Sequence, residues 1–142
     1  MDKYKTWLIT LGLSDYAKIK LIEKYNNEEN IYNNIDNIIK EKLLQKNFLT
    51  KIKNNNKEKE EKLEEYLFKN NIKYVTYSSS LYPERLKNID NPPYVIFYKG
   101  DITLLNYNMV AIVGSRKNTN YGEQVTKFIV SELIIRKTWY CF

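Results

Sequence analysis

The chain has 142 residues, and 23 lysines and arginines against 17 aspartates and glutamates give it a formal charge of +6. It has no histidine and one cysteine, Cys141, which excludes an internal disulfide, a cysteine metal cluster and a His-based catalytic triad. A moderate basic excess fits binding of a polyanion, and it fits equally well a surface of solvated lysines. No segment approaches the roughly 18 apolar residues of a membrane span, and the N-terminus lacks the apolar core of a signal peptide. We therefore expect a cytoplasmic protein with no membrane contact, metal or cofactor.

Residues 1–70 are predicted to form a small helical module. A first helix ends near Gly12, and Ser14 is a candidate N-cap of a second helix, which Asn26 and Asn27 break. The apolar positions expected in these two helices are Trp7, Leu8, Leu11, Leu13, Tyr16, Ile19, Leu21, Ile22 and Tyr25. Further short helices are expected to carry Ile31, Ile35, Ile38, Ile39, Leu43 and Leu44.

The highly charged stretch that ends near residue 71 has two interpretations. Lysines and glutamates at i,i+4 spacing, followed by Leu63, Tyr66, Leu67 and Phe68, indicate a helix with one solvated face. The same composition is compatible with a linker between two modules.

After residue 71 the hydrophobic pattern changes from helical to strand-like. Strands are predicted over 72–77, 94–99 and 109–113, and the last two are expected to be buried. A helix is expected to start at Tyr121 or Gly122, and another strand to begin at Trp139. We predict an α + α/β chain in which residues 71–142 form an incomplete Rossmann-like domain, doubly wound around a mainly parallel sheet.

The turn from the strand at 109–113 to the next helix is the candidate site. Gly114 would let a phosphate approach the backbone, and Ser115 could donate a hydrogen bond. Arg116 and Lys117 would place positive charge at the start of the helix, for which Thr119 and Asn120 are candidate N-caps. The spacing matches neither GxGxxG nor a P-loop. Physical chemistry alone leaves an anion site and a purely structural turn both open.

A second segment, around Tyr82 and Pro83, also stands out. Tyr82 and Leu86 would anchor one helical turn against the sheet, and we favour this structural role over contact with a ligand. Asp90 and Glu84 lie in connecting segments and suggest no paired-carboxylate site.

Two linked motifs, SLYPERLKNIDNPPYVIFYKG (residues 80–100) and VAIVGSRKNTNYG (residues 110–122), resemble the DprA/Smf family of DNA-processing proteins over about residues 72–135. The helical residues 1–70 resemble the family's N-terminal module, of sterile-alpha-motif or helix-hairpin-helix type, without a diagnostic residue. The resemblance implies a non-enzymatic protein that binds single-stranded DNA and loads the RecA recombinase during natural transformation. It also implies that Arg116 belongs to a positive pocket for the DNA backbone, shaped by Gly114 and Ser115. Lys117 joins this set by charge and position alone.

The family pattern continues beyond the point where this sequence stops at Phe142. We therefore expect a chain truncated within the Rossmann-like domain, with compromised activity and without the surface through which family members form homodimers. Two alternatives stay open: a nucleotide-hydrolysing Rossmann-like enzyme, and a fragment without independent function.

Overall fold

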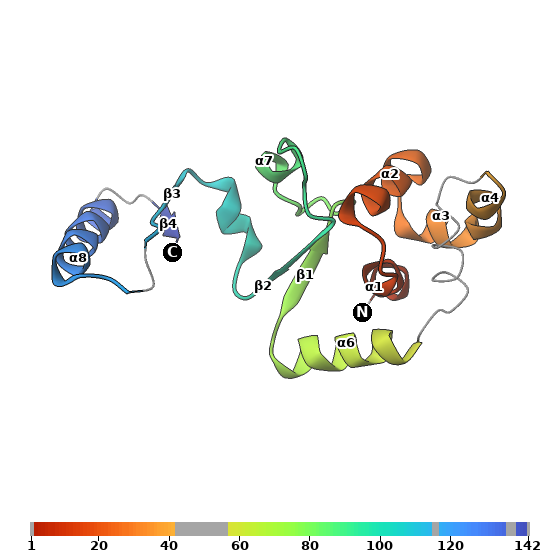
Figure 1. Ribbon diagram of the computed structural model, residues 1–142, viewed down its shortest axis with the longest axis horizontal. Coiled ribbons are helices and arrows are strands. Elements are labelled where there is room, and N and C mark those ends of the chain that lie inside the picture. The colour runs from red at the N-terminus through yellow and green to blue at the C-terminus, as the bar shows by residue number, and fades with distance from the viewer. Residues whose placement is uncertain (1, 42–56, 115–116, 136–138, 142) are drawn as a thin grey trace. The chain divides into compact units, whose positions relative to one another are not determined.

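The computed structural model describes residues 2–41, 57–114, 117–135 and 139–141. The chain forms two compact units, residues 1–100 and 101–142 (Figure 1). The first unit therefore combines the predicted helical module with the first strands, and a domain boundary near residue 70 stays a prediction. In the described residues no helix is long and apolar enough to cross a membrane.

Four short helices open the first unit, and polar side chains set their starts. They are α1 (Lys3–Thr10), α2 (Asp15–Tyr25), α3 (Glu28–Asn33) and α4 (Ile35–Lys40). Asp2, Ser14 and Asn27 accept hydrogen bonds from backbone N–H groups in the first turns of α1, α2 and α3, which confirms Ser14 as an N-cap. The predicted break after α2 is also confirmed, because Asn26 has φ of 71° and closes the helix there.

The core of this unit consists of apolar side chains from the helices and from the segment before the second strand. Its buried members are Trp7, Leu8, Leu11, Leu13, Ile19, Leu21, Ile22, Ile31, Ile38 and Tyr94. Most of the predicted core positions are thus confirmed, whereas Leu43 and Leu44 lie outside the described residues. Tyr16 is an exception, because it is 66% exposed on α2. Its neighbours Ile19 and Ile22 fill the buried face of that helix.

The charged stretch is a helix, α6 (Lys57–Lys69), with an i,i+4 ion pair between Glu58 and Lys62. It packs beside α1, where the Thr6 hydroxyl donates to the Glu64 carboxylate over 3.0 Å. Leu67 is the buried residue of α6. The helix interpretation is therefore correct for residues 57–69.

A two-stranded antiparallel sheet follows in the same unit (Figure 1). Strand β1 (Lys73–Thr76) pairs with β2 (Val95–Tyr98), and the short helix α7 (Glu84–Lys87) lies in the connection between them. The expectation that the second strand is buried is wrong at Phe97, which is 45% exposed. In the described residues β2 pairs with β1 alone, so part of the strand meets solvent.

The second unit contains a 3-10 helix, η1 (Ile102–Asn106), strand β3 (Met109–Ala111), helix α8 (Asn120–Ile135) and strand β4 (Trp139–Cys141). Strands β3 and β4 are parallel, so α8 is the crossover of one β-α-β unit. Full burial of the third strand was the wrong expectation, because Val110 is 41% and Val113 89% exposed. In the described residues β3 pairs with β4 alone, and part of its apolar surface stays exposed. The described chain therefore mixes helices with two small sheets.

Candidate functional site

The predicted site lies in the loop between β3 and α8. The loop leaves the carboxyl end of a strand in parallel pairing and leads directly into a helix of 16 residues. At such a junction backbone N–H groups and the positive end of the helix dipole face the same side, which favours a bound anion. The architecture that the site prediction requires is therefore present.

Thr119 fixes the start of α8. Its hydroxyl accepts a hydrogen bond from the Gly122 N–H at 3.1 Å, and its carbonyl accepts from the Glu123 N–H at 3.0 Å. Of the two candidate caps, Thr119 has the N-cap geometry and Asn120 is the first helical residue. The Thr126 hydroxyl donates to the Gly122 carbonyl one turn later.

The structure describes two of the four predicted site residues. Gly114 and Lys117 are exposed, whereas Ser115 and Arg116 lie outside the described residues. Gly114 does not have the positive φ of Gly12 or Gly100, and an added Cβ there would meet no atom within 4 Å. Neither a left-handed turn nor local crowding therefore explains this glycine. The space beside its backbone is open.

Acidic charge near the loop is locally balanced. Glu123, in the first turn of α8, accepts a hydrogen bond from Lys127 at 2.6 Å. This hydrogen bond and the lysine's charge lower the pKa of Glu123. In the described residues no group of three or more Cys, Asp or Glu side chains could hold a metal ion.

The second candidate, Tyr82, is buried and has a structural role. Its hydroxyl donates to the Pro93 carbonyl at 2.6 Å, and its ring meets the Tyr77 ring edge-on with centroids 5.4 Å apart. Burial raises the pKa of Tyr82 to about 12. These contacts hold the segment before α7 against the residues that lead into β2. The prediction that Tyr82 has a structural role is therefore confirmed.

A family of known proteins matches the stretch that contains both motifs. A model of the family described as DNA recombination-mediator protein A matches residues 73–139. The chain is 46% identical over 69 residues to the DNA processing protein DprA of Bacillus subtilis, a match that covers 48% of this chain and 23% of that protein. It is 36% identical over 76 residues to the DNA processing protein DprA of Streptococcus pneumoniae, over 49% of this chain and 27% of that protein.

Residues 73–139 belong to the DprA family. The chain spans about a quarter of the length of these two relatives. No solved structure matches it significantly. The DprA segment starts with β1 and includes both strands of the first sheet, which lie in the same unit as the N-terminal helices, and it continues through β3 and α8.

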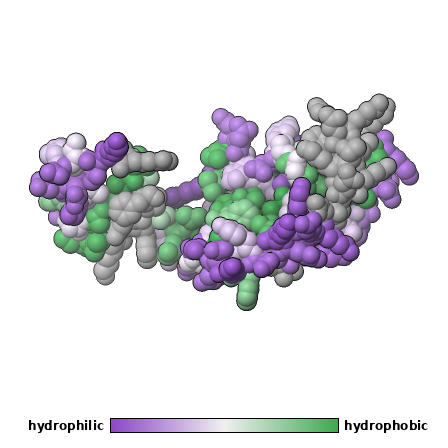
Figure 2. Space-filling model, turned by 60° about the horizontal axis from the view of Figure 1, so that its bottom comes forward, coloured by the Kyte–Doolittle hydropathy of each residue, from purple (hydrophilic) through white to green (hydrophobic). Residues whose placement is uncertain are grey.

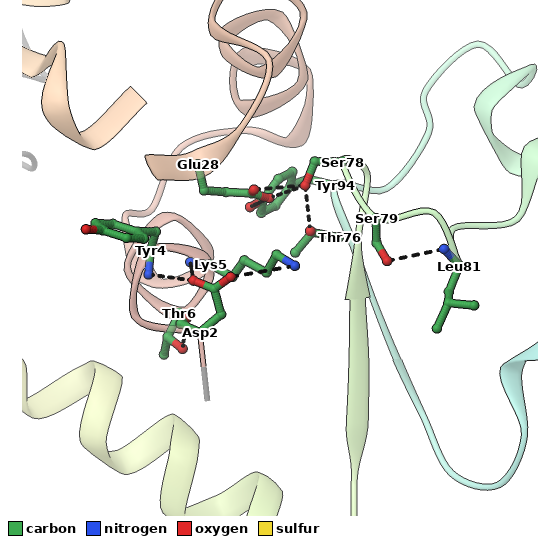
Figure 3. Close-up of polar contacts among 10 residues, drawn as sticks. All are labelled: Asp2, Tyr4, Lys5, Thr6, Glu28, Thr76, Ser78, Ser79, Leu81 and Tyr94. Atoms are coloured by element: carbon green, nitrogen blue, oxygen red, sulfur yellow. Dashed lines mark hydrogen bonds and ion pairs between the residues drawn. The ribbon is translucent and has the colours of Figure 1, made fainter. Parts of the chain in front are cut away.

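One group that the sequence did not suggest joins the DprA segment to the helices. The Glu28 carboxylate of α3 is buried and accepts a hydrogen bond from the Tyr94 hydroxyl at 2.9 Å (Figure 3). The Ser78 hydroxyl lies 2.7 and 2.8 Å from the two Glu28 oxygens. Burial, followed by the charge of Glu28, raises the pKa of Tyr94. Glu28 follows the helix cap Asn27, and a glutamate there ordinarily indicates only a favourable helix start.

Lys18 completes this buried polar group from α2. Its ammonium donates to the Ile9 carbonyl at 3.0 Å and lies 5.3 Å from the centre of the Tyr94 ring. Burial lowers the pKa of Lys18, and the charge of Asp15 acts in the opposite direction. Side chains from α2, α3 and the β1–β2 connection thus contact one another, and we infer that this group stabilises the first unit.

Proposed function

We propose that the chain is a DNA-processing protein that binds single-stranded DNA through the 114–117 loop and the N-terminus of α8. Membership of residues 73–139 in the DprA family carries this proposal. The loop lies at the carboxyl end of a parallel strand, its glycine has open space beside it, and the neighbouring carboxylate of Glu123 is paired with Lys127. Each feature favours a phosphate ligand.

In this proposal Arg116 grips a DNA phosphate through paired N–H donors, Ser115 adds a hydroxyl donor, and Lys117 adds charge. Gly114, which has no side chain, allows a DNA phosphate to come close to the protein backbone. We further propose that β3, α8 and β4 form the first unit of a Rossmann-like domain, since a right-handed β-α-β crossover is its repeating element.

The wider role is DNA recombination, with RecA as protein partner and DNA uptake in natural transformation as the setting. The proposal contains no catalytic step. Release of phosphate from nucleotides by the purified chain, at a rate that Arg116→Ala abolishes, would instead support a nucleotide-hydrolysing enzyme. The RecA partnership is tested by RecA-dependent ATP hydrolysis on single-stranded DNA covered by a single-strand-binding protein. If the chain loads RecA, adding it should make this hydrolysis faster.

Fluorescence anisotropy with a labelled 20-nucleotide oligo(dT) tests the proposed site. We expect Arg116→Ala to weaken binding about tenfold or more, because a charge-assisted hydrogen bond contributes about 1.5–3 kcal/mol. The slope of log affinity against log salt should fall by about 0.7 for each phosphate that the variant no longer neutralises. Lys40→Ala is the matched control, since it removes one exposed positive charge from α4, in the other unit, and leaves the Glu123–Lys127 pair intact. Equal affinity of wild type and Arg116→Ala would show that the loop is not the DNA site.

A further inference from the structure

An aromatic groove of about 460 Å³ lies in the first unit, at the tight turn from α6 into β1. We define it by Phe68, Ile72, Lys73, Tyr74 and Tyr98, which are among its lining residues. The groove and its lining belong entirely to residues 1–100, whereas the 114–117 loop belongs to the other unit.

The backbone of the turn holds Phe68 beside the start of the strand. Asn71 adopts φ of 51°, and its N–H donates to the Phe68 carbonyl at 3.1 Å. The Ile72 N–H donates to the Leu67 carbonyl at 2.8 Å, which closes the end of α6. Leu67 is thereby buried, while its neighbour Phe68 is 89% exposed.

The sheet register supplies the other side of the groove. Lys73 and Tyr98 are directly paired across β1 and β2, so their side chains leave the sheet on the same face. Tyr98 is partly buried, whereas Lys73 is exposed. An exposed phenylalanine, a partly exposed tyrosine and a lysine thus border one surface. Figure 2 brings the bottom of Figure 1, where α6 lies, toward the viewer, and hydrophilic and hydrophobic residues lie side by side there.

The charges around the aromatic groove favour an anionic ligand. Lys73 lines it, and Lys69 and Lys99 adjoin lining residues at the ends of α6 and β2. None of these three lysines has an ion-pair partner in the part of the chain that the structure describes, and the lining contains no carboxylate.

A second groove in the same unit has the opposite character. It measures about 440 Å³, lies between α2 and the α7 segment, and its lining includes the carboxylates of Asp15, Glu23 and Asp90. Its two lysines, Lys20 and Lys87, are both paired with glutamates. Exposed aromatic rings occur in both grooves, but only the aromatic groove combines them with unpaired positive charge.

We propose that the aromatic groove binds single-stranded nucleic acid, with a base stacked on Phe68 and a neighbouring base on Tyr98. Aromatic stacking accepts any base, and nearby lysines attract the phosphates, so this is a contact of low sequence preference. The inference rests on the proposed function. It adds a second contact region, in the other unit, to the loop proposed above.

Oligo(dT) binding by the full 142-residue chain tests the inference, with anisotropy as the readout. We expect Phe68→Ala to weaken binding at least fivefold, the lower range for loss of one stacked base, and Phe68→Tyr to retain wild-type affinity. Tyr16→Ala removes an exposed aromatic ring from the second groove, between α2 and the α7 segment, and should leave binding unchanged. Because Phe68 is almost fully exposed, its replacement should leave the circular dichroism spectrum unchanged.

Photo-crosslinking of a bromodeoxyuridine oligonucleotide gives an independent readout. We expect cross-links to Phe68 or Tyr98. Wild-type affinity in Phe68→Ala, or cross-links confined to residues 101–142, would overturn the groove while leaving the loop proposal intact. Loss of affinity in Phe68→Ala with none in Arg116→Ala would overturn the loop and support the groove. A wild-type chain that binds no DNA would overturn both, and the exposed Phe68 would then fit a protein partner instead.

Discussion

The two units of this chain differ in how completely they bury their apolar residues. In residues 1–100 four helices enclose a core that includes Leu8, Ile31 and Ile38, each with 0% exposure. Among residues 101–114 and 117–135, Ile102 is the only buried side chain, and α8 has none. The proposed DNA site thus lies on the unit with fewer buried side chains, whereas the first unit is stabilised by apolar packing and a buried polar group.

Because of this difference, we expect replacements of core residues in the first unit to change stability, and replacements near the 114–117 loop to change DNA binding. Phe128, Ile134 and Ile135 on α8 are 66%, 57% and 72% exposed. Removing atoms from an exposed side chain leaves no cavity, so replacements on α8 should cost little. Truncation of buried core side chains in the first unit should destabilise it far more.

The largest expected effect follows from truncating a core side chain. Leu8→Ala should lower the free energy of unfolding of the first unit by about 2–5 kcal/mol, because the cavity would be surrounded by well-packed neighbours. Phe128→Ala is the control in the other unit and should change stability by less than about 0.5 kcal/mol. Hydrogen exchange read peptide by peptide resolves the two units. Loss of protection in both units together after Leu8→Ala would show that they unfold as one body.

Alkaline pH tests the buried tyrosines of the first unit. The pKa of Tyr82 is raised to about 12 and that of Tyr94 is raised as well, both chiefly by burial. In the unfolded chain these hydroxyls ionise near the ordinary value of about 10. The stabilising contribution is therefore complete below pH 10 and is lost as pH rises through the folded-state pKa values.

We accordingly expect the free energy of unfolding to fall between about pH 10 and pH 12. Glu28→Gln should lower the pKa of Tyr94, because it removes the neighbouring negative charge. Tyrosinate absorbance monitors the 13 tyrosines, of which these two should titrate late, as should Tyr74, whose pKa is also raised by burial. Titration of all 13 as one group near pH 10 would contradict the burial of Tyr82 and Tyr94.

Local sequence signals predicted the elements well. Ser14 before an apolar helical pattern, Asn26 and Asn27 after it, and the strand-like run at 109–113 each depend on interactions within a few residues. Such signals placed α2, β1 and the start of α8 close to their observed bounds. The family motif likewise lies within one continuous stretch.

Long-range features escaped prediction because no local pattern encodes them. Glu28 and Tyr94 are 66 residues apart, and nothing near either residue indicates their hydrogen bond. Exposure of Tyr16 and Val110 depends on whether another element covers them, which hydropathy cannot tell. In the candidate site Thr119 was anticipated as a cap, whereas the roles of Ser115 and Arg116 stay predictions.

The smallest effect we predict concerns the helix start at the candidate site. Thr119→Ala should destabilise the first turn of α8 by about 0.5–2 kcal/mol, because the Gly122 N–H loses its acceptor. Thr119→Ser keeps that hydroxyl and should behave as wild type. Hydrogen exchange of residues 120–135 measures the change, and residues 1–100 should be unaffected because their core is separate. If the cap also positions the loop for DNA, Thr119→Ala should weaken oligo(dT) binding less than Arg116→Ala does. Unchanged exchange in α8 would mean that Thr119 does not determine where this helix begins.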